Sequence, residues 1–312
     1  MTDLLLVLAG ICLLYLGGEG LVRGATSAGR RMGIDPMVVG LTIVSMGTSG
    51  PELAATLTGV LQGKPAIALG NVVGSNISNL GLVLGVVALI WPLDVAARFI
   101  RREAPIMIAT SGLVYILVYN GVISRFEGIF LLVLLIWYVR SLLRRESETP
   151  QIEAEFQEAY DRSTLSPWLS AAAIVVGIAL LVIGARILIE GAVGLASILG
   201  ISNRVVGLTM VALGTSLPEL ASCIVAALHR ESDVVLGNLI GSNVFNILFI
   251  LGLTSVVRPI AVDTQAVWMD LGVMMGISIL AWFFLRTKSH VGRFEGVVLI
   301  LVYATYIGFL FT

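Results

Sequence analysis

Charged residues are scarce in this chain. Of its 312 residues, only 12% are Asp, Glu, Lys or Arg, whereas 57% are hydrophobic. Soluble domains carry about 25% charged residues, so this composition excludes a water-soluble enzyme. It also excludes a disordered chain, which needs low hydrophobicity. The formal net charge of -1 gives no indication of a nucleic-acid partner.

Residues that often bind metals or carry redox chemistry are few and scattered. The two cysteines, Cys12 and Cys223, lie inside apolar runs, where a thiol usually behaves as a small buried hydrophobe. The two histidines, His229 and His290, fall in expected loops and lack the spacing of metal ligands. We therefore assign these residues no redox or metal role, and we expect no cofactor.

Apolar runs of membrane-spanning length are abundant. A helix needs about 20 predominantly apolar residues to cross a bilayer, and charged clusters separate ten such runs. The sequence therefore predicts an all-α integral membrane protein with ten transmembrane helices. No basic region precedes Leu4, so we expect the first run to be retained rather than cleaved as a signal peptide. The runs are 4–23, 36–61, 66–92, 103–119, 126–143, 167–189, 204–228, 234–259, 266–285 and 294–311.

Two motifs occur once in each half of the chain. Residues 40–52 read GLTIVSMGTSGPE and residues 207–219 read GLTMVALGTSLPE. Residues 70–79 read GNVVGSNISN and residues 237–246 read GNLIGSNVFN. One constant offset relates both pairs without a gap, which indicates an internal duplication. With a shift of one further residue, the sequence RFEG at Arg125 also recurs at Arg293.

The duplication predicts the domain organisation. We expect a first five-helix repeat over residues 1–143, an acidic linker over 144–166 and a second five-helix repeat over 167–312. The charge of the linker favours a solvated connection over a regulatory cation site. Because five is an odd number, the second repeat enters the membrane from the opposite side, and the repeats are expected to be inverted.

Basic residues predict the orientation in the membrane. The loops after the odd-numbered runs contain most of the Lys and Arg residues, among them Arg30, Arg31, Arg101 and Arg102. By the positive-inside rule these loops and the linker are cytoplasmic, and both termini lie outside.

Two carboxylates lie near the middle of apolar runs. A charge at the bilayer centre costs about 2.5 to 3.5 kcal/mol, and no Lys or Arg is available at the depth of Glu52 and Glu219, so their natural partner is a mobile cation. Pro51 and Pro218 lack an N–H and break the helix just before each carboxylate. A broken helix in mid-membrane frees carbonyl groups and favours an ion site.

The hydroxyl groups beside these carboxylates complete a set of oxygens such as Ca²⁺ prefers. They belong to Thr48, Ser49, Thr215 and Ser216. The alternative interpretation is a capping box, with Ser at the N-cap, Pro in the first turn and Glu three residues on. We expect capping to occur in part, but a hydroxyl or an amide would cap a helix in the bilayer at less cost than a carboxylate.

The second motif places further polar side chains on one helix face. On a helix, Asn71, Ser75 and Asn79 follow each other at four-residue spacing, and the equivalent residues do so in the second half. We expect the amide oxygens of Asn79 and Asn246 to bind ions, although helix packing is the alternative. Asn76 and Asn243 point away from this stripe, which indicates a structural role.

These paired motifs closely resemble the alpha-repeats of the cation/Ca²⁺ antiporter superfamily, and most of all its prokaryotic sodium/calcium exchangers. The resemblance covers almost the whole chain except the linker and implies a sodium/calcium exchanger-like fold. It implies that Glu52 and Glu219 are the central ligands shared by Ca²⁺ and Na⁺. The further ligands that it implies are oxygens of Thr48, Ser49, Thr215, Ser216, Asn79, Asn246, Ser75 and Ser242 and the backbone carbonyls of Ser45 and Ala212.

Two positions depart from the family pattern. Some members have Asp where this chain has Asn246, so the cluster has one titratable group fewer. Gly50 replaces the usual Leu, which loosens the packing beside the first Glu. Proton-coupled relatives tend to have a further Glu in the second motif, and its absence here lowers the support for proton coupling.

The sequence therefore predicts an antiporter and not an enzyme. It would exchange Na⁺ for Ca²⁺ across the plasma membrane of a bacterium or archaeon by alternating access, with net charge movement. Its partners are the two ions and the bilayer, and no obligate protein partner is evident. The alternatives are an H⁺-coupled cation exchanger of the same fold and, more distantly, a cation channel. The glycine-rich first and sixth spans are the candidate sliding helices.

Overall fold

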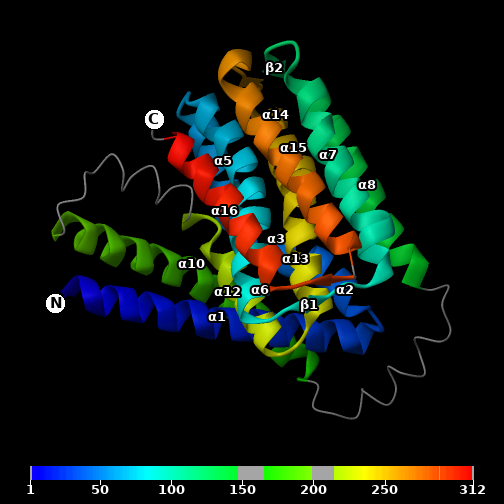
Figure 1. The fold of residues 1–312 in the computed structure, drawn as a ribbon. Coiled ribbons are helices and arrows are strands. Elements are labelled where there is room, and N and C mark those ends of the chain that lie inside the picture. The colour runs from blue at the N-terminus through cyan, green and yellow to red at the C-terminus, as the bar shows by residue number, and fades with distance from the viewer. Residues whose placement is uncertain (1, 147–164, 199–213, 288, 311–312) are drawn as a thin grey trace. The chain divides into compact units, whose positions relative to one another are not determined.

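The computed structural model describes residues 2–146, 165–198, 214–287 and 289–310 (Figure 1). These residues form two compact units. Unit 1 comprises residues 1–48 and 140–238, and unit 2 comprises residues 49–139 and 239–312. Each unit combines segments from both halves of the sequence, so the units and the predicted repeats divide the chain differently. The division into two repeats and a linker stays a prediction.

Unit 1 is built around two long helices. Its elements are α1 (Thr2–Met32), α2 (Pro36–Val39), the π-helical segment η1 (Gly40–Val44), α3 (Ser45–Thr48), α10 (Pro167–Ile198), α12 (Leu217–Leu228) and the part of α13 (Ser232–Phe245) up to Asn238. Helices α1 and α10 lie side by side, and α12 packs against α1 (Figure 1). A Cβ atom added at Gly17 would lie 2.7 Å from the backbone nitrogen of Leu181, and one at Gly24 would lie 2.8 Å from the carbonyl oxygen of Ser170. These glycines therefore allow the two backbones to approach closely.

The second span is interrupted where the sequence predicts. Asp35 caps α2 by accepting a hydrogen bond from the N–H of Met37 at 2.8 Å. The helical path continues through η1 and α3 to Thr48, and α4 (Gly50–Leu61) begins after Ser49. Pro51 occupies the first turn of α4, where its missing N–H costs nothing. The predicted break is therefore confirmed.

Unit 2 contains the remaining elements. They are α4, α5 (Pro65–Ser78), η2 (Asn79–Val83), α6 (Leu84–Ile90), β1 (Leu93–Asp94), η3 (Phe99–Glu103), α7 (Ala104–Val118), β2 (Val122–Ile123), α8 (Arg125–Glu146) up to Val139, the end of α13, η4 (Asn246–Leu251), α14 (Gly252–Val257), β3 (Ile260–Ala261), α15 (Thr264–Arg286), β4 (His290–Val291) and α16 (Arg293–Leu310). Within this unit α16 packs against α6, and α15 packs against α5 and α7.

The short strands of unit 2 repeat one pairing. Strands β1 and β4 are antiparallel with Leu93 opposite Val291, and β2 and β3 are antiparallel with Ile123 opposite Ile260. Leu93 and Ile260 are related by the offset of the two motifs, and Ile123 and Val291 by the offset of the RFEG sequence. The same register therefore joins equivalent segments of the two halves in both sheets.

The lengths and apolar composition of the described helices support the prediction of a membrane protein. Seven of them are long and apolar enough to cross a membrane. The predicted run 36–61 is broken at Ser49, and the run 103–119 consists of η3 and the 15-residue α7. The run 204–228 is described only from residue 214, and it contains the short apolar helix α12. The all-α membrane fold class is confirmed.

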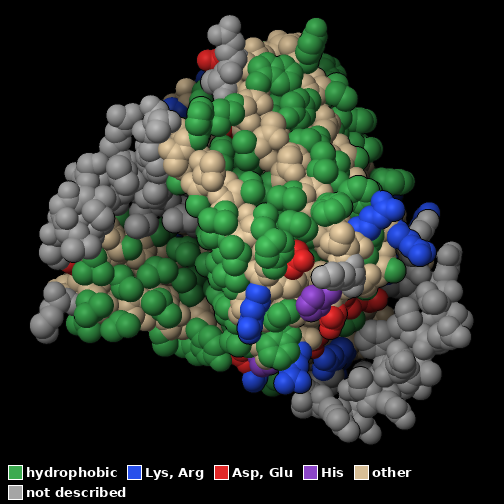
Figure 2. Space-filling model, in the orientation of Figure 1, with side chains coloured by type: hydrophobic (Ala, Val, Ile, Leu, Met, Phe, Trp, Pro, Cys, Tyr) green, Lys and Arg blue, Asp and Glu red, His purple; other side chains and the backbone are tan. Residues whose placement is uncertain are grey.

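Apolar side chains also lie on the outside of the helices. On α8, Phe126, Phe130, Val133 and Trp137 are exposed and share one helical face. In Figure 2, hydrophobic side chains far outnumber charged ones on the described part of the visible face. Exposed apolar faces of this kind are stable in contact with lipid.

Candidate ion-binding site

Glu52 lies in unit 2, in the first turn of α4, and it is fully buried. The neighbouring helix α5 holds this turn in place. Nδ2 of Asn71 donates to the backbone carbonyl of Glu52 at 3.1 Å and to the hydroxyl of Thr56 at 3.0 Å. The first turn of a helix favours a negative side chain because its free N–H groups carry partial positive charge.

Glu219 takes the equivalent position in unit 1. It is fully buried in the first turn of α12, and Oγ of Ser222 donates to its backbone carbonyl at 3.0 Å. Nδ2 of Asn238 donates to Oγ of Ser222 at 3.1 Å and to Sγ of Cys223 at 3.3 Å. Asn238 thus anchors the helix of Glu219, as its repeat equivalent Asn71 anchors that of Glu52.

The sequence motifs predict no role for Asn71 and Asn238 beyond a polar stripe. The sequence does contain a signal for this anchoring role. Asn71 follows Glu52, and Asn238 follows Glu219, at the same spacing in the sequence. Cys223 is buried, as expected, and it takes part in a hydrogen bond, whereas Cys12 is exposed on α1. The expectation of burial is therefore wrong for Cys12.

The serine side chains do not form their half of the predicted capping box in either motif. Ser49 and Ser216 do occupy the N-cap positions of α4 and α12, but neither makes a side-chain cap hydrogen bond. Their backbone angles, with φ -77° and ψ 10° at Ser49 and φ -87° and ψ 2° at Ser216, differ from the β-region geometry of capping residues. The buried hydroxyl of Ser216 has no hydrogen-bond partner among the described residues.

Ser45 and Thr48 form a small buried network in unit 1. Oγ1 of Thr48 lies 3.3 Å from the carbonyl oxygen of Ser45 and 3.4 Å from Oδ1 of Asn238. Oγ of Ser45 lies 2.7 Å from the carbonyl oxygen of Gly40 and 3.0 Å from that of Asn238. Both residues are fully buried, so their oxygens are held away from bulk solvent.

Asn79 and Asn246 lie in unit 2, each at the start of a π-helical segment. Such segments often occur at functional sites. Both side chains are fully buried, and Oδ1 of each has no hydrogen-bond partner among the described residues. Ser75 and Ser242 are buried one helical turn earlier. Because α4 and α5 both pack against η4, the helices that carry Glu52, Asn79 and Asn246 lie together within unit 2.

The predicted ligands are thus divided between the units, and each unit contains one of the two proposed carboxylates. Unit 2 contains Ser49, Glu52, Ser75, Asn79, Ser242 and Asn246, and unit 1 contains Ser45, Thr48, Thr215, Ser216 and Glu219. Thr215 is half-buried, and Ala212 lies outside the described residues. Within the described ranges, no group of three or more His, Cys, Asp or Glu side chains could hold a metal ion. Cation ligands in either unit would therefore come mostly from hydroxyl, amide and backbone oxygens.

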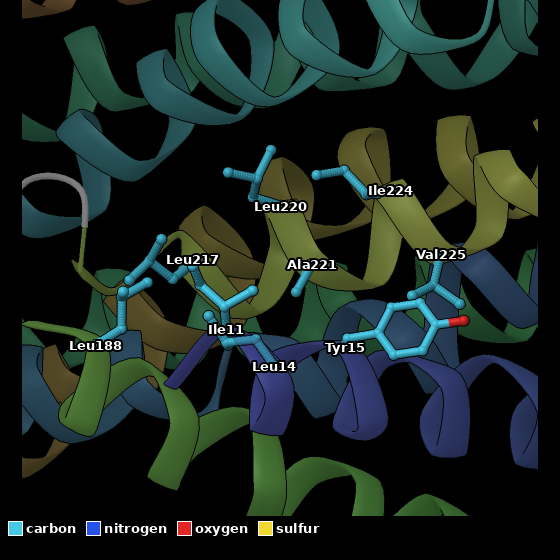
Figure 3. A pocket seen from close by; sticks show the side chains of 9 residues that line it. All are labelled: Ile11, Leu14, Tyr15, Leu188, Leu217, Leu220, Ala221, Ile224 and Val225. Atoms are coloured by element: carbon cyan, nitrogen blue, oxygen red, sulfur yellow. The ribbon is translucent and has the colours of Figure 1, made fainter. Parts of the chain in front are cut away.

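A pocket of about 260 Å³ lies beside the helix of Glu219 in unit 1 (Figure 3). Apart from the hydroxyl of Tyr15, its lining side chains are apolar, so it lacks the ligands of a cation site. The side chains that line it are Ile11, Leu14, Tyr15, Leu188, Leu217, Leu220, Ala221, Ile224 and Val225.

Comparison with known proteins identifies the family. The family model described as sodium/calcium exchanger protein matches residues 2–143 and 169–312. The chain belongs to the sodium/calcium exchanger family. It is therefore an integral membrane protein of a transporter family, and the resemblance inferred from the two motifs is confirmed.

Relatives within this family match over nearly their full length. The sodium/calcium exchanger MaX1 of Methanosarcina acetivorans is 32% identical over 99% of each chain. The inner membrane protein YrbG of Escherichia coli K12 is 36% identical over 94% of this chain and 92% of its own. A structure of the sodium-calcium exchanger NCX_Mj superposes with a TM-score of 0.84 at 30% identity over 99% of each chain. The exchanger fold is therefore confirmed as well.

Proposed function

We propose that this protein is a secondary antiporter that exchanges Na⁺ for Ca²⁺ across a prokaryotic plasma membrane by alternating access. The observation that carries the proposal is the pair of fully buried glutamates, Glu52 and Glu219, in the first turns of two equivalent helices. Membership of the sodium/calcium exchanger family supports the choice of ions. Its function is transport rather than catalysis, with Ca²⁺ and Na⁺ as substrates and no resident cofactor.

Glu52 and Glu219 are the proposed ligands shared by both ions. Burial of the surrounding polar groups supports the rest of the proposed set, because oxygens shielded from water can replace the hydration shell of a cation. The Oδ1 atoms of Asn79 and Asn246 support it further, because neither has a hydrogen-bond partner in the part of the chain that the structure describes. The other proposed ligands are Thr48, Ser49, Thr215, Ser216, Ser75, Ser242 and the backbone carbonyls of Ser45 and Ala212.

The proposed topology has ten transmembrane helices in two inverted repeats. The repeats are residues 1–143 and 167–312, joined by a cytoplasmic linker over 144–166, with both termini outside. The distribution of basic residues supports this orientation. The repeated strand register of unit 2 supports the duplication, and the bacterial inner membrane relative supports the location.

Coupling follows from the charge of the empty site. Two carboxylates without a cation leave a charge of about -2 in hydrocarbon, which is prohibitive to move, whereas Ca²⁺ or several Na⁺ ions neutralise it. Only cation-loaded forms therefore switch between inward-open and outward-open states. Helices α1 and α10 are the proposed sliding elements, with Gly17, Gly18, Gly24, Gly184, Gly191 and Gly194 along them.

The test is uptake of ⁴⁵Ca²⁺ into proteoliposomes under imposed Na⁺, K⁺ or H⁺ gradients. We expect a Na⁺ gradient alone to drive uptake. Uptake driven by a proton gradient and indifferent to Na⁺ would replace the proposal with an H⁺-coupled exchanger. Unitary currents in planar bilayers would indicate a channel instead.

A further inference from the structure

Four asparagines of the second motif meet inside unit 2. Asn76 on α5 and Asn243 on α13 are each 1% exposed, and Asn79 and Asn246 are fully buried. Nδ2 of Asn246 donates to Oδ1 of Asn76 at 3.0 Å. Nδ2 of Asn79 donates to Oδ1 of Asn243 at 3.4 Å. Each bond therefore joins a candidate ligand of one half of the chain to an asparagine of the other half.

The side chains that accept these bonds are themselves held in place, and the donor of each lies close to a methionine sulfur. Nδ2 of Asn76 donates to the backbone carbonyl of Asn243 at 3.2 Å and lies 3.8 Å from Sδ of Met274. Nδ2 of Asn243 lies 3.5 Å from Sδ of Met107. Met107 and Met274 are related by the same offset as Asn76 and Asn243. The donors of both asparagines are therefore engaged, and their Oδ1 atoms are left to accept.

This arrangement fixes the orientation of the two candidate ligands. An amide side chain has its donor on one branch and its acceptor on the other. If the amide of Asn246 turned over, its oxygen would face Oδ1 of Asn76, and two acceptors would repel each other. The same holds for Asn79 and Asn243. Oδ1 of Asn79 and of Asn246 thus points away from its anchor, and a buried oxygen without a hydrogen-bond partner is a suitable ligand for a hard cation.

We propose that Asn76 and Asn243 are positioning residues for ion exchange. They orient the amides of Asn246 and Asn79 so that both side-chain oxygens bind the transported cation, and they contact no cation themselves. This inference rests on the proposed function, in which Asn79 and Asn246 are ligands. It differs from a packing role, in which the asparagines only join helices.

A double-mutant cycle separates the two roles. Asn76→Ala is made in the wild type and in an Asn246→Asp background, where both terminal atoms of residue 246 are oxygens and orientation no longer matters. The readouts are ⁴⁵Ca²⁺ binding to the purified protein without Na⁺ and the Ca²⁺ concentration for half-maximal Na⁺-driven uptake, both at alkaline pH. We expect Asn76→Ala to weaken Ca²⁺ affinity about tenfold in the wild type and less than about twofold in the Asp background.

The other half of the chain provides an independent cycle, with Asn243→Ala in an Asn79→Asp background. This second cycle tests the inference alone if Asn76→Ala does not fold, and the first does so if Asn243→Ala does not fold. Ser111→Ala is the matched control, because this buried hydroxyl donates to the backbone carbonyl of Met107 at 2.9 Å rather than to either ligand. We expect it to leave the affinity unchanged.

Two outcomes would overturn the inference. Equal losses of affinity in both backgrounds would assign the asparagines to packing, and unchanged affinity in the single variants would remove any role in orientation. With either of these outcomes, normal Na⁺/Ca²⁺ exchange by the wild-type protein would still support the proposed function. A wild type that neither binds Ca²⁺ nor takes it up under a Na⁺ gradient would refute the proposed function itself.

Discussion

The hydroxyl of Tyr138 donates a hydrogen bond to Oε2 of Glu103 at 2.9 Å, and this pair has a counterpart in Tyr306 and Asp270, whose oxygens are 3.0 Å apart. Both pairs lie in unit 2 and are related by the offsets of the two halves. The first joins α8 to the segment before α7, and the second joins α16 to α15. Glu103 is fully buried, and its Oε1 lies 3.2 Å from Nη1 of Arg102, whereas Asp270 is half-buried. The last two helices of each half are thus tied by a tyrosine and an acid.

We predict that Tyr138→Phe destabilises the protein by about 1 to 3 kcal/mol, because it removes a hydrogen bond from a buried carboxylate. Tyr306→Phe is the matched control and should cost less, since water can replace its hydroxyl at the half-buried Asp270. The measurement is the free energy of unfolding in mild detergent. Equal losses in both variants would contradict this reasoning.

The second prediction concerns the carboxylates. Glu52→Gln and Glu219→Gln should each abolish Na⁺-driven Ca²⁺ flux, because a neutral amide leaves the charge of Ca²⁺ uncompensated in hydrocarbon. Each variant should still insert and fold, as checked by size-exclusion chromatography and thermal unfolding. Near-normal transport by either variant would remove that residue from the ligand set.

Glu127→Gln is the control for the same chemical change. Oε2 of Glu127 accepts from the N–H of Ser124 at 2.6 Å and caps α8, and glutamine can serve in the same capping position. Its transport should match that of the wild type.

Much of the architecture could be predicted from sequence because it depends on local chemistry. Pro51 cannot donate a backbone hydrogen bond, so the interruption at Ser49 follows from one residue. The ends of the long helices were harder to place. The apolar run 4–23 ends at Arg23, but α1 continues to Met32, because charge ends an apolar run without breaking a helix. Arg30 and Arg31 even favour the last turn of α1 through the helix dipole.

The candidate site could be predicted only in part. The residue types and their spacing in both halves predict which side chains are buried oxygens. The partners of those side chains could not be predicted, because they belong to helices far apart in the sequence. The bond from Asn246 to Asn76 depends on how α5 packs against η4. The absence of cap hydrogen bonds from the two serine side chains depends on backbone angles at Ser49 and Ser216 that no motif specifies.

The third prediction concerns Asn246. Its amide cannot titrate, whereas Asn246→Asp adds a group that binds a proton or a cation and, when ionised, cannot donate to Oδ1 of Asn76. Transport by this variant should therefore depend more strongly on pH than that of the wild type. The check is the initial rate of Na⁺-driven Ca²⁺ uptake across a pH series. An unchanged pH profile with unchanged Na⁺ affinity would place Asn246 outside the ion cluster.

The fourth prediction concerns the interface of α1 and α10. A Cβ atom at Gly17 would lie 2.7 Å from the backbone nitrogen of Leu181 and 2.8 Å from the carbonyl oxygen of Gly177. Gly17→Ala should therefore force the helices apart and cost about 1 to 3 kcal/mol. In the control Gly276→Ala, no described atom beyond the neighbouring backbone of its own helix lies within 4 Å of the new Cβ, so helix propensity should give a gain of up to about 1 kcal/mol. Thermal unfolding of both variants gives the sign of each change in stability. Equal shifts of the unfolding temperature in the two variants would contradict close packing at Gly17.

The last prediction is that exchange moves charge. With about -2 fixed on Glu52 and Glu219, one Ca²⁺ or two Na⁺ ions give a neutral site, whereas three Na⁺ ions give about +1. The number of oxygen-rich positions, together with the family resemblance, favours three Na⁺ ions. Net positive charge should then enter the cell as Ca²⁺ leaves.

A charge that crosses the whole membrane field gains about 2.3 kcal/mol per 100 mV. This free energy changes the equilibrium ratio of Ca²⁺ concentrations across the membrane roughly fifty-fold. The measurement clamps the liposome potential with K⁺ and valinomycin and finds the Na⁺ gradient at which net Ca²⁺ flux vanishes. With three Na⁺ ions per Ca²⁺ this reversal point shifts with voltage, because one net charge crosses in each cycle. A reversal point independent of voltage would mean two Na⁺ ions per Ca²⁺, since the charges exchanged would then be equal.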